Sequence, residues 1–147
     1  MHVLAVCVVV GLGILFAPMD SQRYLEARPS GELVDRNGRT LYAFLNRDEQ
    51  WCLVRDLDEL GSRIVQATVA AEDQRFYGHW GVDPIAVVRA VWQDVRHGKV
   101  VSGGSTVTMQ VVKLRDGIQR SVAWKALQAL RALRLEWRAD KKEILTA

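Results

Sequence analysis

The residue whose position most clearly suggests chemistry is Glu72. Val65, Val69 and Phe76 lie at helical spacing from it, which places its carboxylate within an apolar stripe. Desolvation raises the pKa of a carboxyl group, and a raised pKa suits a general base that works near neutral pH. The alternative is a carboxylate paired with an arginine or held at the rim of the stripe. The sequence therefore makes Glu72 a candidate catalytic base.

Three further polar residues follow it closely. On a continuing helix Asp73 would point about 100° away from its neighbour, so we interpret it as a structural partner. His79 and Asp83 fall in the loop Gly78–Asp83, where a histidine most often hydrogen-bonds the backbone and fixes the turn. A metal site formed by Asp73, His79 and Asp83 is a weaker alternative, because this spacing fits no standard metal site.

A glycine-rich turn provides a second candidate site. Gly103–Thr106, with the sequence GGST, precedes an expected helix, and free N–H groups at a helix start favour an anion such as phosphate or pyrophosphate. Thr106, Gln110 and Lys113 are spaced i, i+4 and i+7, which makes one polar stripe that ends in a cation. A solvated helix face explains this stripe equally well.

Capping signals place both candidate sites on a mainly helical domain. Asp83 before Pro84 is a typical helix start, and Gly98 a typical end. Asp140 and Glu143 form the pattern of a capping box. The expected helices are Leu60–Tyr77, Asp83–Gly98, Ser105–Leu114 with Ser105 as cap, Gln119–Arg138, and a fifth that begins at Asp140.

Apolar periodicity predicts which helix faces pack. On the second helix the expected packed side holds Ile85, Val88, Val91, Trp92 and Val95. On the fourth helix it holds Ala123, Ala126, Leu127, Leu130, Leu133 and Trp137. Gln128 falls on the other side of the fourth helix, with Trp124, Ala132 and Leu135, so we expect it to face a cleft.

The N-terminal segment predicts a membrane anchor. Val3–Ala17 carries no charged residue, and Met1–Met19 just reaches the length that crosses a bilayer. It lacks the basic start and clear cleavage site of a signal peptide, so we interpret it as a retained transmembrane helix. Residues 20–57 read as a connector with a β-hairpin, in which Asn37-Gly38 is expected to form a type I′ turn. The expected organisation is therefore an anchor at 1–19, a connector at 20–57 and a helical domain at 58–147.

Composition limits the class of protein. The chain has 147 residues, enough for one domain with a short appendage or one domain cut short. With 49% hydrophobic and 25% charged residues it is globular. The net charge of +3 is too small for a histone-like binder, and no nucleic-acid partner is expected. Cys7 and Cys52 supply neither a disulfide framework nor a cysteine metal site.

The two candidate sites together resemble the peptidoglycan glycosyltransferases. Glu72–Asp83, EDQRFYGHWGVD, resembles the first family motif, EDxxFxxHxGxD, and Gly103–Lys113, GGSTVTMQVVK, resembles the second, GGSTxTxQxxxK. They stand in the family's order, about 20 residues apart. Arg120–Gln128 is similar to the third motif and Lys142–Leu145 to the start of the fourth. The resemblance covers Leu33–Ala147 and points to class A penicillin-binding proteins of the 1C type.

The resemblance implies a lysozyme-like α fold, here incomplete, that polymerises lipid II into glycan strands with inversion at the donor anomeric carbon. It implies that Glu72 is the catalytic base and that Lys113, Arg120 and Lys125 hold the donor pyrophosphate. The other substrate-binding residues that it implies are Asp73, Phe76, His79, Gly104, Ser105, Thr106, Gln110 and Gln128. Some relatives use Mg²⁺ or Mn²⁺, and the sequence assigns no metal ligand.

The resemblance also implies a location and partners. The chain is expected to be a single-pass protein of the inner membrane, with the catalytic domain on the periplasmic side. The implied partners are lipid II, the nascent glycan strand, the inner membrane and cell-wall synthesis proteins.

The chain departs from the family pattern in three places. Gln128 stands where the third motif usually has Glu, and Trp124 where Arg is common. The sequence stops at Ala147, which predicts a truncated chain that is marginal and inactive by itself. Two other functions stay open: a lysozyme-like hydrolase with Glu72 as its acid, and an inert anchored fragment that binds glycan precursors or a partner.

Overall fold

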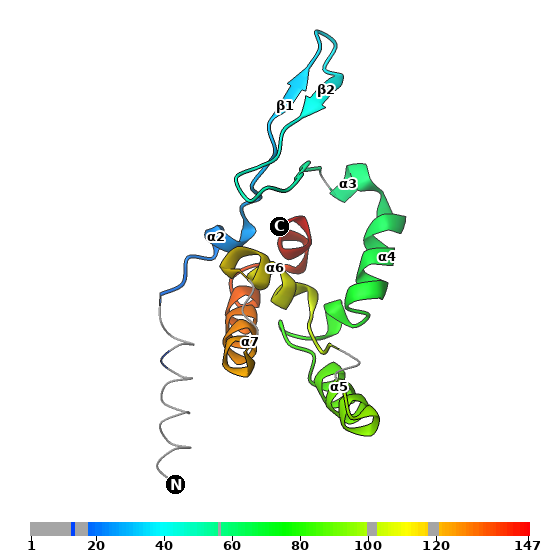
Figure 1. The fold of residues 1–147 in the computed structure, drawn as a ribbon, viewed down its shortest axis with the longest axis vertical. Coiled ribbons are helices and arrows are strands. Elements are labelled where there is room, and N and C mark those ends of the chain that lie inside the picture. Colours follow the sequence, from blue (N-terminus) through cyan, green and yellow to red (C-terminus); the bar gives the residue numbers. More distant parts are fainter. Residues whose placement is uncertain (1–12, 14–17, 56, 100–102, 118–120) are drawn as a thin grey trace.

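The computed structural model describes residues 13, 18–55, 57–99, 103–117 and 121–147 (Figure 1). This part of the chain is mainly helical, with one two-stranded antiparallel sheet. The expected transmembrane run lies almost wholly outside the described residues. Within the described part, no helix combines the length and apolar character that a membrane span requires.

Helices and one hairpin follow each other along the chain. The elements are α2 (Gln22–Leu25), β1 (Glu32–Val34), β2 (Thr40–Ala43), α3 (Leu57–Leu60), α4 (Ser62–Glu72), the 3₁₀ turn η1 (Phe76–Gly78), α5 (Pro84–His97), α6 (Val107–Asp116), α7 (Val122–Glu136) and α8 (Lys141–Thr146). β1 pairs with β2 in the register Glu32 opposite Ala43, Leu33 opposite Tyr42 and Val34 opposite Thr40. Figure 1 shows this hairpin projecting away from the helices.

The hairpin forms where the sequence predicts it, but with another turn. Gly38 has φ 79°, whereas Asn37 does not take a positive φ. A type I′ turn requires positive φ at both central residues, so that prediction is wrong. The reason is the Asp35 carboxylate, which accepts hydrogen bonds from Asn37 N at 2.8 Å and Arg39 N at 2.9 Å. These bonds stabilise a longer loop across the two strands.

The first expected helix is interrupted and ends early. Gly61, with φ 77°, separates α3 from α4, and α4 ends at Glu72 rather than at Tyr77. Asp73 caps it with φ −156° and ψ 75°, outside the helical region. This break turns the Asp73 side chain inward, where it finds the partners described below.

The start and end of α5 are confirmed. The Asp83 side chain accepts from Ile85 N and Ala86 N, Pro84 occupies the first turn, and Gly98 ends the helix with φ 65°. The capping box of Asp140 and Glu143 at α8 is also present, with both reciprocal hydrogen bonds.

The helix α6 is capped one residue later than expected. Thr106, not Ser105, is the N-cap, since its side chain accepts from Met109 N. The helix also continues beyond Leu114 to Asp116. Helix α7 is shorter than expected, because Ser121 caps it and it ends at Glu136.

The core lies where α6, α7 and α8 meet. Phe76, Val112 and Leu135 are fully buried, together with Ile144 of α8. Helix α6 contacts both α7 and α8, and Figure 1 shows these three gathered together while α5 stands apart. The core therefore fixes the start of α6 next to the loop that follows α4.

The packed faces of two helices differ from the prediction. On α5 the apolar stripe is exposed, with Ile85 63% and Val95 78% accessible. Its opposite side holds Ala86 and the buried Ala90, and here the backbone of Val87 comes close to the loop at Gly104. This close approach, rather than total apolar area, determines which side of α5 packs.

On α7 the packed side is the one that holds Gln128, Ala132 and Leu135, all buried. The expected core residue Trp137 is instead 55% exposed. The reason is again close backbone packing, because the loop at Gly81 lies directly against Ala132. Gln128 thus belongs to a packed surface and does not present an open amide to a cleft.

Candidate functional site

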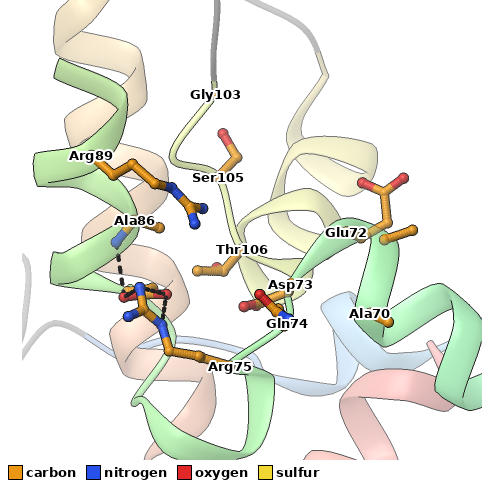
Figure 2. A pocket seen from close by; sticks show the side chains of 12 residues that line it. Ala70, Glu72, Asp73, Gln74, Arg75, Ala86, Arg89, Gly103, Ser105 and Thr106 are labelled. Atoms are coloured by element: carbon orange, nitrogen blue, oxygen red, sulfur yellow. Dashed lines mark hydrogen bonds and ion pairs between the residues drawn. The ribbon is translucent and has the colours of Figure 1, made fainter. Parts of the chain in front are cut away.

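A polar pocket of about 190 Å³ lies between the end of α4, the start of α5 and the loop before α6. Its lining includes Glu72, Asp73, Gln74, Arg75, Asp83, Ala86, Arg89, Gly103, Ser105 and Thr106 (Figure 2). The first and second sequence motifs, distant along the chain, therefore line one pocket. The structure brings together the two candidate sites that the sequence treats separately.

Glu72 sits at the rim of this pocket and is held by the second motif. Gln110 Nε2 donates a hydrogen bond to Glu72 Oε2 at 2.7 Å. The Glu72 side chain is exposed, so the predicted burial in an apolar stripe is wrong. Val69 and Phe76 enter the core, but α4 ends at Glu72 and its side chain turns toward α6. Orientation by Gln110, rather than desolvation, is what the structure provides.

Asp73 links the first motif to the start of α6. His79 Nε2 lies 3.0 Å from both Asp73 carboxylate oxygens, and Val107 N donates to Asp73 Oδ2 at 3.1 Å. Both side chains are buried. The prediction of Asp73 as a structural partner is confirmed, while His79 binds this carboxylate and not the backbone that the sequence predicted.

These contacts also change the interpretation of the α6 start as an anion site. The Asp73 carboxylate already lies at the positive helix end through Val107 N. The Thr106 hydroxyl takes a second N–H, that of Met109, at 3.2 Å. Two of the N–H groups at this helix start are therefore satisfied within the chain, and the anion site at Gly103–Thr106 stays a prediction.

Asp83 forms the opposite wall of the pocket. Arg75 binds it through two nitrogens, with Nε to Oδ2 at 2.9 Å and Nη2 to Oδ1 at 2.8 Å. Burial raises the pKa of the Asp83 carboxyl group, but the hydrogen bonds from Ala86 N and Arg75 outweigh it and lower the pKa overall. The Asp83 carboxylate therefore stays ionised, and it serves the structure through the hydrogen bonds that it accepts from Arg75 and the start of α5.

The alternative of a metal site is not supported in the part of the chain that the structure describes. No group of three His, Cys, Asp or Glu side chains lies close enough there to hold an ion. Asp73 is bound to His79, and Asp83 is bound to Arg75.

The loop before α6 packs tightly on its neighbours. A Cβ atom on Gly104 would lie 3.0 Å from Val87 Cα of α5. The Thr106 hydroxyl donates to Gly81 O at 2.5 Å, and Thr106 is 1% exposed. Ser105 is half-buried on the pocket wall. Gly104 and Thr106 thus pack this loop against its neighbours, and Ser105 lines the pocket.

The remaining predicted residues fall in different places. Phe76 is fully buried in the core, with Lys141 Nζ 4.3 Å from its ring centroid. Lys113 and Lys125 are exposed on α6 and α7. Arg120 lies outside the described residues. Gln128 is buried on α7, as described above.

Sequence reasoning missed the two arginines of the pocket. Arg75 occupies a variable position of the first motif, and Arg89 lies on α5. Figure 2 shows the Arg89 side chain extending toward the loop that holds Ser105, with Glu72 at the opposite rim. The signal for Arg89 is its spacing of three residues from Ala86, which places both on the α5 side that faces the loop.

Comparison with known proteins identifies the family. Residues 37–147 match the family model described as Transglycosylase. The chain is 40% identical over 121 residues to penicillin-binding protein 1C of Escherichia coli (strain K12), a match that covers 82% of this chain and 16% of that protein. It is 39% identical over 106 residues to penicillin-binding protein 1B of Haemophilus influenzae, which covers 71% of this chain and 14% of that protein.

A third relative, penicillin-binding protein 1A of Aquifex aeolicus, is 36% identical over 117 residues, which are 79% of this chain and 16% of that protein. The chain belongs to the transglycosylase family, the glycosyltransferase domain of class A penicillin-binding proteins. It spans about a sixth of the length of the curated relatives that it matches.

Proposed function

We propose that this chain carries the donor- and acceptor-binding motifs of a peptidoglycan glycosyltransferase that polymerises lipid II into glycan strands. The observation that supports this most strongly is the contact between Glu72 and Gln110, which joins the first and second motifs at the rim of one polar pocket. A lysozyme-like arrangement of the complete domain is part of the same proposal.

In this proposal Glu72 is the general base. It takes the proton of the 4-hydroxyl group of the acceptor GlcNAc as that oxygen attacks the donor MurNAc anomeric carbon, with inversion. Gln110 holds Oε2, and no described residue donates a hydrogen bond to Oε1. An acceptor hydroxyl can therefore approach Oε1 while the carboxylate keeps its orientation.

The leaving group is undecaprenyl pyrophosphate, which needs cations as its negative charge develops. Lys113 lies one turn after Gln110 on α6 and is exposed, so it continues the polar side of α6 beyond the residue that contacts Glu72. Lys125 is exposed near the start of α7. We assign Lys113, Lys125 and Arg120 to the donor pyrophosphate.

Lysine and arginine side chains meet the charge of the leaving group in this proposal, and no metal ligand is assigned. Gln128, which stands where the family usually has Glu, is a neutral and buried amide.

The proposal includes an anchor at residues 1–19, a connector at 20–57 and a catalytic region from 58 onward on the periplasmic side of the inner membrane. The uncharged run Val3–Ala17 supports it, because a lipid-linked donor must be met at the bilayer surface. Fractionation of cells followed by an alkaline wash tests this: the chain is expected to stay with the membranes. Mature protein that begins after Ala17 in the soluble periplasm would contradict it.

Product analysis separates polymerisation from the hydrolase alternative. The full-length enzyme is incubated with lipid II or with finished glycan, and the products are resolved by size. We expect glycan polymer from lipid II and no shortening of finished glycan. Lys113→Ala should raise the KM for lipid II more than it lowers kcat, because it removes a donor-binding charge. Shortened finished glycan would favour the hydrolase.

A further inference from the structure

A second pocket, rich in arginine, lies where the chain leaves its N-terminal apolar run. It has a volume of about 170 Å³ and is lined by Pro18, Met19, Asp20, Arg23, Tyr24, Arg131 and Arg134. We call it the arginine pocket. It shares no residue with the pocket at Glu72, so the proposed glycosyl transfer does not account for it.

The buried carboxylate of Asp116 holds three residues that line the arginine pocket. Its side chain is 4% exposed, and Oδ2 accepts a hydrogen bond from Arg131 Nη1 at 2.6 Å. Oδ1 accepts from the Tyr24 hydroxyl group at 3.1 Å and lies 3.7 Å from Arg23 Nη2. One carboxylate therefore aligns two arginines from different elements, and the geometry of the pocket is fixed before any ligand arrives.

Arg134 adds a buried cation to the same pocket. The residue is 6% exposed. Burial lowers the pKa of its guanidinium group, and the nearby Arg138 and Arg131 lower it further. The pocket brings three arginine guanidinium groups together with the carboxylates of Asp20 and Asp116. This excess of positive charge favours an anionic ligand.

The position of the pocket indicates which anion it meets. Pro18 and Met19, which line it, directly follow the apolar run Val3–Ala17 that the sequence predicts to cross the bilayer. Arg138 Nη1 donates to Met19 O at 2.8 Å and ties this point to the turn that follows α7. This placement rests on the anchor that the proposed function includes: a pocket at the end of that span would lie at the depth of the lipid headgroups.

We propose that the arginine pocket binds the phosphate group of an anionic phospholipid headgroup. Guanidinium groups bind phosphate oxygens in a forked geometry, so arginine suits this ligand better than lysine. Bound lipid would fix the orientation of the helical domain relative to the membrane. Inorganic phosphate has the same chemistry, and the experiment must separate these two sources.

Native mass spectrometry of the full chain measures lipid retention directly. The protein is equilibrated in detergent with equal amounts of phosphatidylglycerol and phosphatidylcholine, and the ratio of the two bound lipids is recorded. Arg23→Gln should lower this ratio roughly fivefold, the effect expected of one basic residue at an anionic surface. Arg23 is largely exposed, with a 3.7 Å ion pair to Asp116 and its guanidinium group 5.9 Å from the Tyr24 ring centroid, so the fold should survive.

Two further variants make the test specific. Asp20→Asn removes a carboxylate from the pocket while its oxygen can still accept from Gln22 N, so it should raise the ratio. Arg36→Gln makes the same charge change on the exposed hairpin loop and should leave the ratio unchanged. Equal losses in Arg23→Gln and Arg36→Gln, or no preference for phosphatidylglycerol in the unaltered chain, would overturn the proposal.

A buried variant and free phosphate complete the experiment. Arg134→Gln should abolish the preference for phosphatidylglycerol, while its circular dichroism spectrum keeps the helical signal. If this variant does not fold, the comparison of Arg23→Gln with Arg36→Gln decides. Inorganic phosphate in the millimolar range should leave the lipid ratio unchanged. If it removes the preference, the pocket is a site for soluble anions and the lipid assignment is wrong.

Discussion

Gln110 Nε2 donates to Glu72 Oε2 at 2.7 Å and so joins the last residue of α4 to the first turn of α6. The residues are 38 positions apart in the chain. Through this contact a residue of the second motif orients the carboxylate of the first motif. In the proposed mechanism, the amide of Gln110 determines which carboxylate oxygen is left for the acceptor hydroxyl.

Gln110→Ala should therefore reduce kcat more than it changes KM for lipid II. A lost hydrogen bond to a charged group corresponds to roughly 10–100-fold in rate if the base loses its orientation. Steady-state kinetics of the full-length enzyme measures this. Gln66→Ala, an exposed glutamine on α4, is the control and should retain full activity. A larger KM with unchanged kcat would mean that Gln110 only binds substrate.

Gly81→Ala should strongly destabilise the domain. Gly81 has φ 80°, and a Cβ atom there would lie 2.5 Å from Ala132 O of α7. Backbone strain and overpacking together should cost roughly 2–5 kcal/mol. Gly78→Ala is the matched control, because its Cβ atom would meet no atom within 4 Å. Thermal unfolding measures both variants, and equal midpoints would show that the loop moves away from α7 at little cost.

Asp83 should make stability depend on pH. Its folded pKa is lowered, so its contribution is complete above the unfolded value of about 3.9 and is lost as the pH falls through the folded value. Asp83→Asn should lower the stability at pH 7 and flatten the loss in acid. Asp58→Asn, an exposed carboxylate of α3, should do neither. Urea unfolding between neutral and acidic pH measures the difference, and parallel curves for Asp83→Asn and the unaltered protein would contradict the prediction.

Lys141 should stabilise the site through a buried ion pair. Lys141 Nζ donates to Glu136 Oε2 at 2.6 Å and to His79 O at 2.8 Å. The Glu136 side chain is 5% exposed, so Lys141→Met leaves a buried charge and should cost roughly 3–5 kcal/mol. The double variant with Glu136→Gln should recover much of this loss, since the amide is neutral and its oxygen can still accept the hydrogen bond that the Thr108 hydroxyl donates to Glu136 Oε1. If the double variant is no more stable than Lys141→Met, the loss of stability does not come from an unpaired buried charge on Glu136.

The sequence predicts elements well where local chemistry determines them. The caps at Asp83 and Asp140 depend on hydrogen bonds within a few residues, and both form as expected. The end of α4 depends instead on Asp73 reaching His79 and Val107, and Val107 is distant in sequence. A periodic pattern cannot show such a contact, so the expected helix is too long.

The sequence predicts the packed faces less well, because close backbone approach determines them. Gly81 against Ala132 and Gly104 against Val87 bring loops directly onto helices. Small residues then mark the packed side, while the larger apolar stripe of α5 stays exposed. In the candidate site, the motifs indicated Glu72 and Gln110, but only the folded chain shows their contact and the arrival of Arg75 and Arg89 at the pocket.

Glu72 is the proposed general base, and the variant Glu72→Gln tests this role. The amide is nearly isosteric, so the fold should persist, but it cannot accept the proton. Polymerisation of lipid II by the purified full-length enzyme is the measurement, with Glu59→Gln on α3 as an exposed control. We predict that Glu72→Gln loses polymerisation, by at least about 100-fold, while Glu59→Gln keeps it. Retention of most turnover by a folded Glu72→Gln enzyme would contradict the account.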